Sequence, residues 1–150
     1  MSIRGVRRWR TDQGGVLVEF TFIAVMLVVV MLGIVEMGRM VLVYTTVANA
    51  ARAGARYAIV HGGERTGSGV NGPSGPGSTT QVQTIVKDYA GAGLLDVSKL
   101  NINVAYPNGT NVADSPVTVT VTYPYDPWVP YFGSLLNVTL GSTSEGVITF

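Results

Sequence analysis

An almost uninterrupted apolar run dominates the first third of the chain. Residues 16–35 contain one charged side chain, Glu19, and apolar residues occupy every face of the helix that this segment would form. At about 1.5 Å per residue the helix is about 30 Å long, which matches the hydrocarbon core of a bilayer. A chain of 150 residues cannot bury an all-round apolar helix of that length. The pattern therefore predicts one transmembrane helix.

Small residues replace the bulky ones beyond the apolar run, and no proline occurs in residues 36–60. We therefore expect one helix over residues 16–60, whose outer half packs on its own head domain, on neighbouring subunits, or on both. Small side chains at helical spacing let backbones approach closely, and alanine is in addition a strong helix former. The expected packing positions are Ala50, Ala51, Gly54, Ala55 and Ala58.

Glycine, serine, threonine and proline dominate residues 61–80. This composition predicts a flexible surface loop that begins where glycine ends the long helix. A phosphate-binding loop is disfavoured, because no strand precedes these glycines and no Gly-Lys-Ser/Thr follows them.

Two periodicities follow in residues 81–150. Apolar residues recur at helical spacing over residues 81–92, with Thr79 or Thr80 as the N-cap, and alternate with polar residues over 100–106 and 117–123. Two more short strands are expected near residues 137–140 and 145–150. Alternation is typical of a sheet with one buried face. The head, residues 81–150, is thus expected to be a small α+β domain with a second helix and an antiparallel sheet of three to four strands.

An aromatic, proline-rich segment occupies residues 123–132. Three interpretations are open: the segment closes the edge of a small core, presents an exposed patch to a partner, or rests on the membrane surface through Trp128.

Charge ahead of the apolar run indicates its direction in the membrane. Arginine occurs at positions 4, 7, 8 and 10, whereas Asp12 is the only acidic residue there. The positive-inside rule places this basic leader, residues 1–14, in the cytoplasm and the C-terminal domain outside it. A secretory signal peptide is disfavoured, because its apolar core would be only about 7–15 residues long. With a net charge of +1, the chain as a whole carries no strong electrostatic footprint for nucleic acid.

The residues that usually carry chemistry are scarce. The chain has no cysteine and one histidine, His61, which adjoins glycines at the expected helix end. The acidic residues of the head are scattered without the spacing of a metal-binding loop. A catalytic site needs a nucleophile, a base or a metal in one place. We therefore expect no enzymatic activity, no metal and no cofactor.

The junction between the leader and the apolar run is unusual. Gly14 and Gly15 precede the run directly, and glycine before a helix can stay extended and admit a protease. A cut between them would leave the entire apolar helix on the mature protein. Glu19 lies five residues after Gly14, and a carboxylate within an apolar span normally has a partner. The new ammonium of Gly15, on the same chain or a neighbour, would supply one; the alternative is that Glu19 reaches headgroup water.

Three sequence elements resemble one known family. Gly14, Glu19 and Phe20 are similar to the Gly-x-x-x-x-Glu-Phe/Tyr processing site of Flp-type prepilins and pseudopilins. The run LGIVEMGR at residues 32–39 and the run NAARAGARYA at residues 49–58 resemble the TadE family of the tight-adherence (Tad) pilus. The resemblance covers roughly residues 5–60. It implies cleavage by an inner-membrane prepilin peptidase at Gly14–Gly15 and a layout like that of type IV pilins.

The resemblance implies a minor pilin or pseudopilin, a structural subunit that helps to assemble a Tad-type pilus. Its partners would be membrane lipid, the prepilin peptidase, other pilins and the inner-membrane assembly platform, with homo- or hetero-oligomers formed through the N-terminal helix. It would reside in the bacterial inner membrane or enter an extracellular pilus. Two alternatives stay open: a polymerising main filament subunit, and an unprocessed single-pass envelope protein whose head binds a ligand.

Overall fold

The computed structural model describes residues 12–93, 95–128 and 138–149. The chain forms two compact units, Met1–Met37 and Gly38–Phe150, and the first helix, α1 (Asp12–Val60), contributes to both. Residues 1–11, which carry the arginines of the predicted leader, lie outside the described residues.

In the first unit, α1 exposes apolar side chains on all its faces. Large residues such as Phe20, Ile23, Met26 and Val30 are exposed over more than half of their surface. Nothing in the described part of the chain buries the most apolar stretch of this helix. A helix that is apolar all round suits a lipid environment, and it is long and apolar enough to cross a membrane.

The start of α1 corrects one expectation. The helix begins at Asp12 rather than at residue 16, so Gly14 and Gly15 are helical and not extended. Helix formation here is local: the terminal turn only adds hydrogen bonds to a helix that already exists, and propagation is far easier than nucleation.

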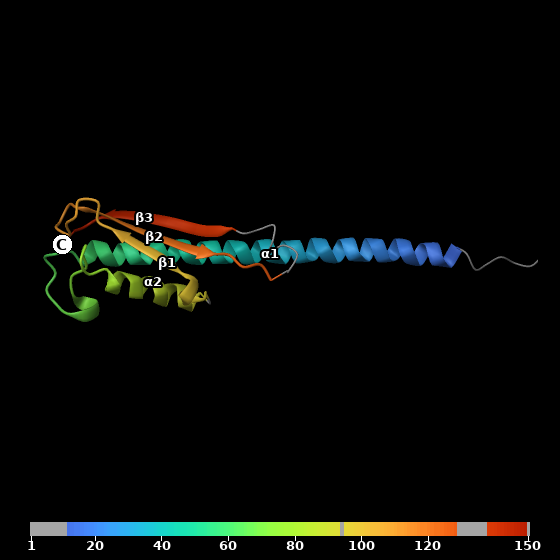
Figure 1. Cartoon of the computed structure of the whole chain (residues 1–150), viewed down its shortest axis with the longest axis horizontal. Helices are drawn as coiled ribbons and strands as arrows, with labels where there is room; N and C mark the ends of the chain where they lie inside the picture. Colours follow the sequence, from blue (N-terminus) through green and yellow to red (C-terminus); the bar gives the residue numbers. More distant parts are fainter. Residues whose placement is uncertain (1–11, 94, 129–137, 150) are drawn as a thin grey trace, which may run out of the picture. The chain divides into compact units, whose positions relative to one another are not determined.

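The second unit contains a three-stranded antiparallel sheet in the order β1-β2-β3. Its strands are β1 (Asn101–Ala105), β2 (Pro116–Pro124) and β3 (Thr139–Val147), and β2 is central (Figure 1). Along β2, Val117, Val119 and Val121 are fully buried while the threonines between them point to the opposite face. The predicted α+β head with one buried sheet face is therefore confirmed.

The last strand differs from the prediction. Two short strands were expected, but β3 runs without a break through the polar residues 141–145 and pairs with β2 along its whole length. None of its residues is fully buried. An edge strand half open to solvent needs few apolar side chains, so its pairing is set by the backbone ladder with β2 and leaves little hydrophobic signal.

The helix α2 (Thr80–Ala92) buries Val82, Val86 and Ala90 against the core. It covers the predicted range, but Thr79 makes no capping hydrogen bond through its side chain. Tyr89 continues the apolar spacing of this helix, four positions after Ile85 and three after Val86, but it is half exposed.

The outer part of α1 meets α2 and β2 at Gly54. A Cβ atom placed on Gly54 would lie 2.5 Å from Cγ2 of Val86 on α2 and 3.3 Å from Cγ1 of Val119 on β2. The neighbouring Ala50, Ala51, Ala55 and Ala58 are also buried in this core. The small residues thus let α1 lie close to its own sheet and second helix.

A polar network holds part of the glycine-rich segment 61–80 against the core. Ser74 is buried; its hydroxyl donates to the carbonyl of His61 at 3.1 Å and accepts from the Tyr106 hydroxyl at 3.2 Å. The side-chain amide of Asn111 donates to the Ser74 carbonyl at 2.9 Å. These bonds bring residues far apart in sequence together at Ser74.

The network predicts a loss of stability at alkaline pH. Burial raises the pKa of the Tyr106 phenol, and the hydrogen bond to Ser74 offsets part of that rise. The folded state therefore holds the neutral phenol more firmly than the unfolded state does. The resulting contribution to the free energy of unfolding is complete below about pH 10, the pKa of the phenol in the unfolded chain. It is lost as the pH rises from there through the raised pKa of the folded state.

We expect Tyr106→Phe to cost about 1 kcal/mol at neutral pH, because one hydrogen bond is lost, and to flatten the alkaline decline. Urea unfolding of the full chain in detergent between neutral and alkaline pH measures both effects. Tyr89→Phe, at a half-exposed position, is the control. An equal alkaline decline in wild type and Tyr106→Phe would contradict the assignment.

Candidate functional site

The predicted processing and pairing residues all lie on the first turns of α1. A Cβ atom added to Gly14 or Gly15 would meet nothing within 4 Å, so the protein itself leaves room around this peptide bond. A protease that binds an extended substrate would still have to unwind the first turn, and helix ends fray readily.

Glu19 and Gly15 are four positions apart on one helix and therefore lie on the same face. Within the described part of the chain, Glu19 has neither a hydrogen bond nor an ion pair. Its neighbour Thr21 is satisfied, because its hydroxyl donates to the Leu17 carbonyl at 2.8 Å. If this part of α1 lies in the hydrocarbon of a membrane, the Glu19 carboxylate therefore needs a partner from outside the described residues.

The predicted helix-packing residues serve the head itself. Ala50, Ala51 and Ala58 have no exposed surface and Ala55 almost none. The sequence left open whether this face meets the head, a neighbour, or both. The structure places these alanines in the core of the head of the same chain.

A groove lies between α1 and α2 on the head. It has a volume of about 490 Å³ and is lined by Asn49, Arg52, Ala53, Arg56, Ile85 and Tyr89. Arg52 donates to the side-chain oxygen of Asn49 at 2.9 Å. The two arginines are one helical turn apart, and neither forms an ion pair within the described residues. The groove is chemically suited to an anionic group.

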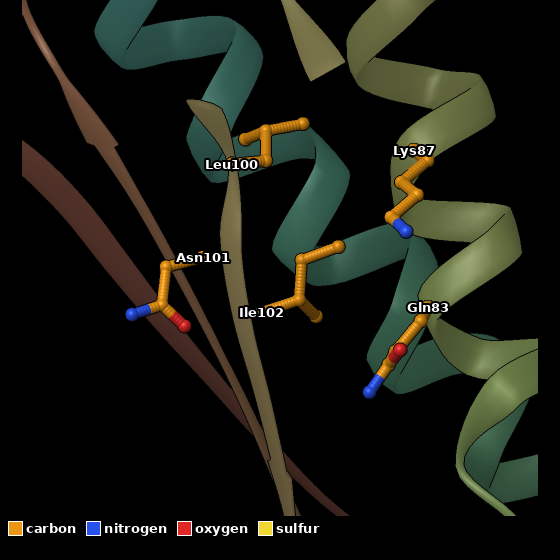
Figure 2. Close-up of a pocket in the computed structure, with 5 residues that line it drawn as sticks. All are labelled: Gln83, Lys87, Leu100, Asn101 and Ile102. Carbon is orange, nitrogen blue, oxygen red and sulfur yellow. The ribbon is translucent and has the colours of Figure 1, made fainter. Parts of the chain in front are cut away.

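A smaller hollow lies between α2 and β1 (Figure 2). Its volume is about 280 Å³, and its lining residues are Gln83, Lys87, Leu100, Asn101 and Ile102. It contains an amine and two amides but no carboxylate, imidazole or hydroxyl. This set provides neither a nucleophile with a base nor a metal-ligand set.

An aromatic cage surrounds Arg39, just beyond the apolar run. The guanidinium carbon of Arg39 lies 5.0 Å from the ring centre of Tyr125 and 4.7 Å from that of Trp128. The same side chain donates to the backbone carbonyl of Asp126. Tyr125 is buried, whereas Trp128 is 78% exposed. We call Arg39, Tyr125 and Trp128 the arginine cage.

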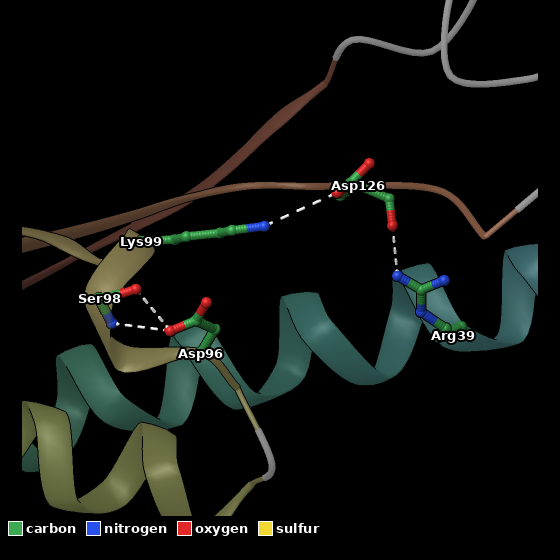
Figure 3. A network of polar contacts seen from close by, with 5 residues as sticks. All are labelled: Arg39, Asp96, Ser98, Lys99 and Asp126. Carbon is green, nitrogen blue, oxygen red and sulfur yellow. Dashed lines mark hydrogen bonds and ion pairs between the residues drawn. The ribbon is translucent and has the colours of Figure 1, made fainter. Parts of the chain in front are cut away.

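Further polar contacts surround the cage (Figure 3). Lys99 pairs with the carboxylate of Asp126 at 3.7 Å. Nearby, Asp96 accepts from the hydroxyl of Ser98 at 2.6 Å and from its backbone amide at 3.0 Å. These two bonds lower the pKa of the Asp96 carboxyl. The bonds fix the turn before β1, while the exposed Lys99–Asp126 pair adds little stability.

Sequence reasoning did not connect Arg39 with the aromatic segment. Of the three interpretations of residues 123–132, core closure holds for the buried Tyr123 and Tyr125 but not for Trp128. Residues 129–132 lie outside the described residues. Two features of the sequence could have suggested this contact: an arginine soon after the apolar run, and an aromatic segment elsewhere in the chain.

No group of three metal-binding side chains occurs among the described residues. His61 stacks on Tyr57, with ring centres 3.9 Å apart, and its Nδ1 lies 2.9 Å from the Tyr57 carbonyl oxygen. These contacts give His61 a structural environment at the end of α1.

Part of the chain is similar to a known protein family. Residues 14–56 match a family model described as TadE-like protein. No curated protein and no solved structure matches the chain. The matched segment begins at the predicted processing glycine, contains Glu19 and Arg39, and ends within the buried small-residue stretch.

Proposed function

We propose that this TadE-like protein is a minor pilin or pseudopilin, a non-catalytic membrane subunit that acts in the assembly of a Tad-type pilus. One observation carries the proposal: the TadE-like segment, residues 14–56, contains the exposed apolar part of α1, whose first turns hold two glycines and Glu19, which has no partner among the described residues. The arrangement supports a role in which the helix, rather than a pocket, is the working part.

Processing by a prepilin peptidase would expose Gly15 as the new N-terminus. Its ammonium and the Glu19 carboxylate would then be opposite charges near the same end of an apolar helix. In hydrocarbon, a charged group at a helix centre costs about 2.5–3.5 kcal/mol on insertion scales. Pairing the two charges between neighbouring subunits would offset part of this cost and set the stagger of one helix against the next.

The proposed location follows from the same helix. The basic leader would stay in the cytoplasm, the apolar segment would span the inner membrane, and the head would lie outside. The partners would be the prepilin peptidase, other pilins and the inner-membrane assembly platform.

A second candidate is an unprocessed single-pass protein with a ligand-binding head. It is favoured by the helical conformation at Gly14 and Gly15 and by the cationic groove that contains Arg52 and Arg56. In this case the full leader would remain on the protein.

The mature N-terminus decides between these candidates. We expect intact-mass and N-terminal peptide analysis of protein from its native membrane to give a start at Gly15. Gly14→Leu should retain the leader, because a bulky side chain at the cleaved bond hinders the close approach of a protease. Gly33→Leu, deeper in the same helix and equally open, is the matched control and should be processed normally. A wild-type start at residue 1 or 2 in cells that contain the peptidase would refute processing.

A further inference from the structure

We infer that the arginine cage is a membrane-docking site that seats the head on the phospholipid headgroup layer outside the membrane through Trp128 and Arg39. The inference goes beyond the proposed function, but it rests on the proposed membrane anchor.

Chain length places the cage at the membrane surface. Arg39 follows the end of the apolar run at Val35 by four residues, which is about 6 Å along a helix. The headgroup region is roughly 5–8 Å thick on each side of the hydrocarbon core. Arg39 therefore emerges at the headgroup layer, and the Trp128 ring lies 4.7 Å from its guanidinium carbon.

Trp128 has the exposure expected of an interfacial anchor. With 78% of its surface exposed, it departs from the usual strong burial of tryptophan in folded domains. Its ring combines a large apolar surface with one N–H donor, and such rings favour the boundary between hydrocarbon and water. At this place in the chain, the exposed ring faces the environment that it prefers.

Arg39 gives the site its preference for phosphate. The buried Tyr125 ring and the Asp126 carbonyl hold its guanidinium in place, so less side-chain freedom is lost on binding. A planar guanidinium recognises phosphate oxygens with paired hydrogen bonds. The cations Arg39 and Lys99 face Asp96, Asp126 and the buried Glu36, which lies one turn before Arg39 on α1. These surroundings carry no excess of positive charge, so we expect contacts with phosphate itself to outweigh general attraction to anionic lipid.

Depth-dependent fluorescence quenching tests the inference on the full chain. The chain has two tryptophans, so Trp9→Phe leaves Trp128 as the sole reporter. The protein is placed in vesicles of phosphatidylcholine and phosphatidylglycerol. One series contains a nitroxide on the lipid headgroup, and another adds iodide to the water. We expect the headgroup nitroxide to quench Trp128 strongly and iodide to quench it weakly.

The matched control places the fluorescent tryptophan at a second position on the head, Tyr89. Tyr89 is about half exposed. It lines the groove beside Asn49 and Ala53, which lie about 15–20 Å further along the helix than Arg39. In the background Trp9→Phe and Trp128→Phe, Tyr89→Trp should reverse the pattern, with strong iodide quenching and weak nitroxide quenching. Arg39→Gln in the Trp128 reporter should reduce nitroxide quenching several-fold.

Two results would overturn the inference. If iodide quenches Trp128 as strongly as the Tyr89 reporter, the cage faces water. If neither quencher reaches Trp128, a second copy of the chain covers it instead of lipid. Resistance to alkaline carbonate extraction separates these failures from a failure of the anchor: a resistant protein with a water-exposed Trp128 leaves the proposed function standing, whereas an extracted protein removes the membrane anchor itself.

Discussion

Gly54→Leu is expected to unfold the head, whereas Gly38→Leu on the same helix should leave it folded. At Gly54 the first added carbon alone would lie 2.5 Å from a methyl of Val86 and 3.3 Å from a methyl of Val119, both of which are fully buried. Inserting extra carbons into a packed core costs about 1–3 kcal/mol, and more where the neighbours cannot move. Leucine adds three carbons beyond the first, which is a severe change for a domain of ordinary stability, about 5–15 kcal/mol.

The smaller substitution Gly54→Ala is expected to destabilise the head less than Gly54→Leu. Gly54→Ala introduces the clash of one carbon, at a cost of about 1–3 kcal/mol, but gains about 1 kcal/mol of helix propensity, so a net loss of about 0–2 kcal/mol is expected. At Gly38 an added Cβ would meet nothing within 4 Å, so only the propensity gain applies. Limited proteolysis and the near-ultraviolet circular dichroism of the tyrosines, on the full chain in detergent, report the state of the head. A native-like Gly54→Leu protein would show that α1 does not pack on the head as described.

Glu19→Gln is expected to lower pilus assembly by roughly five- to thirty-fold, because a polar pair within the membrane contributes about 1–2 kcal/mol to helix association. The substitution keeps the size of the side chain and removes its charge. It eases membrane insertion, so a loss of assembly cannot be ascribed to failed anchoring. Filament yield after shearing and crosslinking of the membrane-resident protein are the two readouts.

Thr21→Val is the matched control for Glu19→Gln. Thr21 lies two residues away in the same segment, and its hydroxyl is satisfied by its own helix at Leu17, so assembly should stay near the wild-type level. Normal assembly of the Glu19→Gln protein with a mature N-terminus at Gly15 would refute the pairing role of Glu19 and leave processing intact. If the Glu19→Gln protein keeps its leader instead, Glu19 acts in peptidase recognition.

The long helix, the second helix and the inward face of β2 could be predicted from the sequence, because each depends on a local repeat. Residues 16–35 are apolar on every side, and Val117, Val119 and Val121 alternate strictly with threonine. Such patterns report burial or lipid exposure directly and need no knowledge of the partner element. The family match over residues 14–56 rests on the same segment, where the residues that carry the resemblance are close in sequence.

Which strands, helices and side chains contact one another was decided by the tertiary structure alone. The continuity of β3 comes from backbone pairing with β2, which polar residues at an edge satisfy as well as apolar ones. Gly54 can be recognised as the meeting point of α1, α2 and β2 only when Val86 and Val119 are placed beside it. The arginine cage joins residues almost ninety positions apart, and a contact of that range leaves no periodic trace in the sequence. The sequence by itself determined the long apolar helix and the family resemblance over residues 14–56, because both are local. Packing decided which small residues are buried and that Trp128 is left exposed, because both depend on long-range contacts.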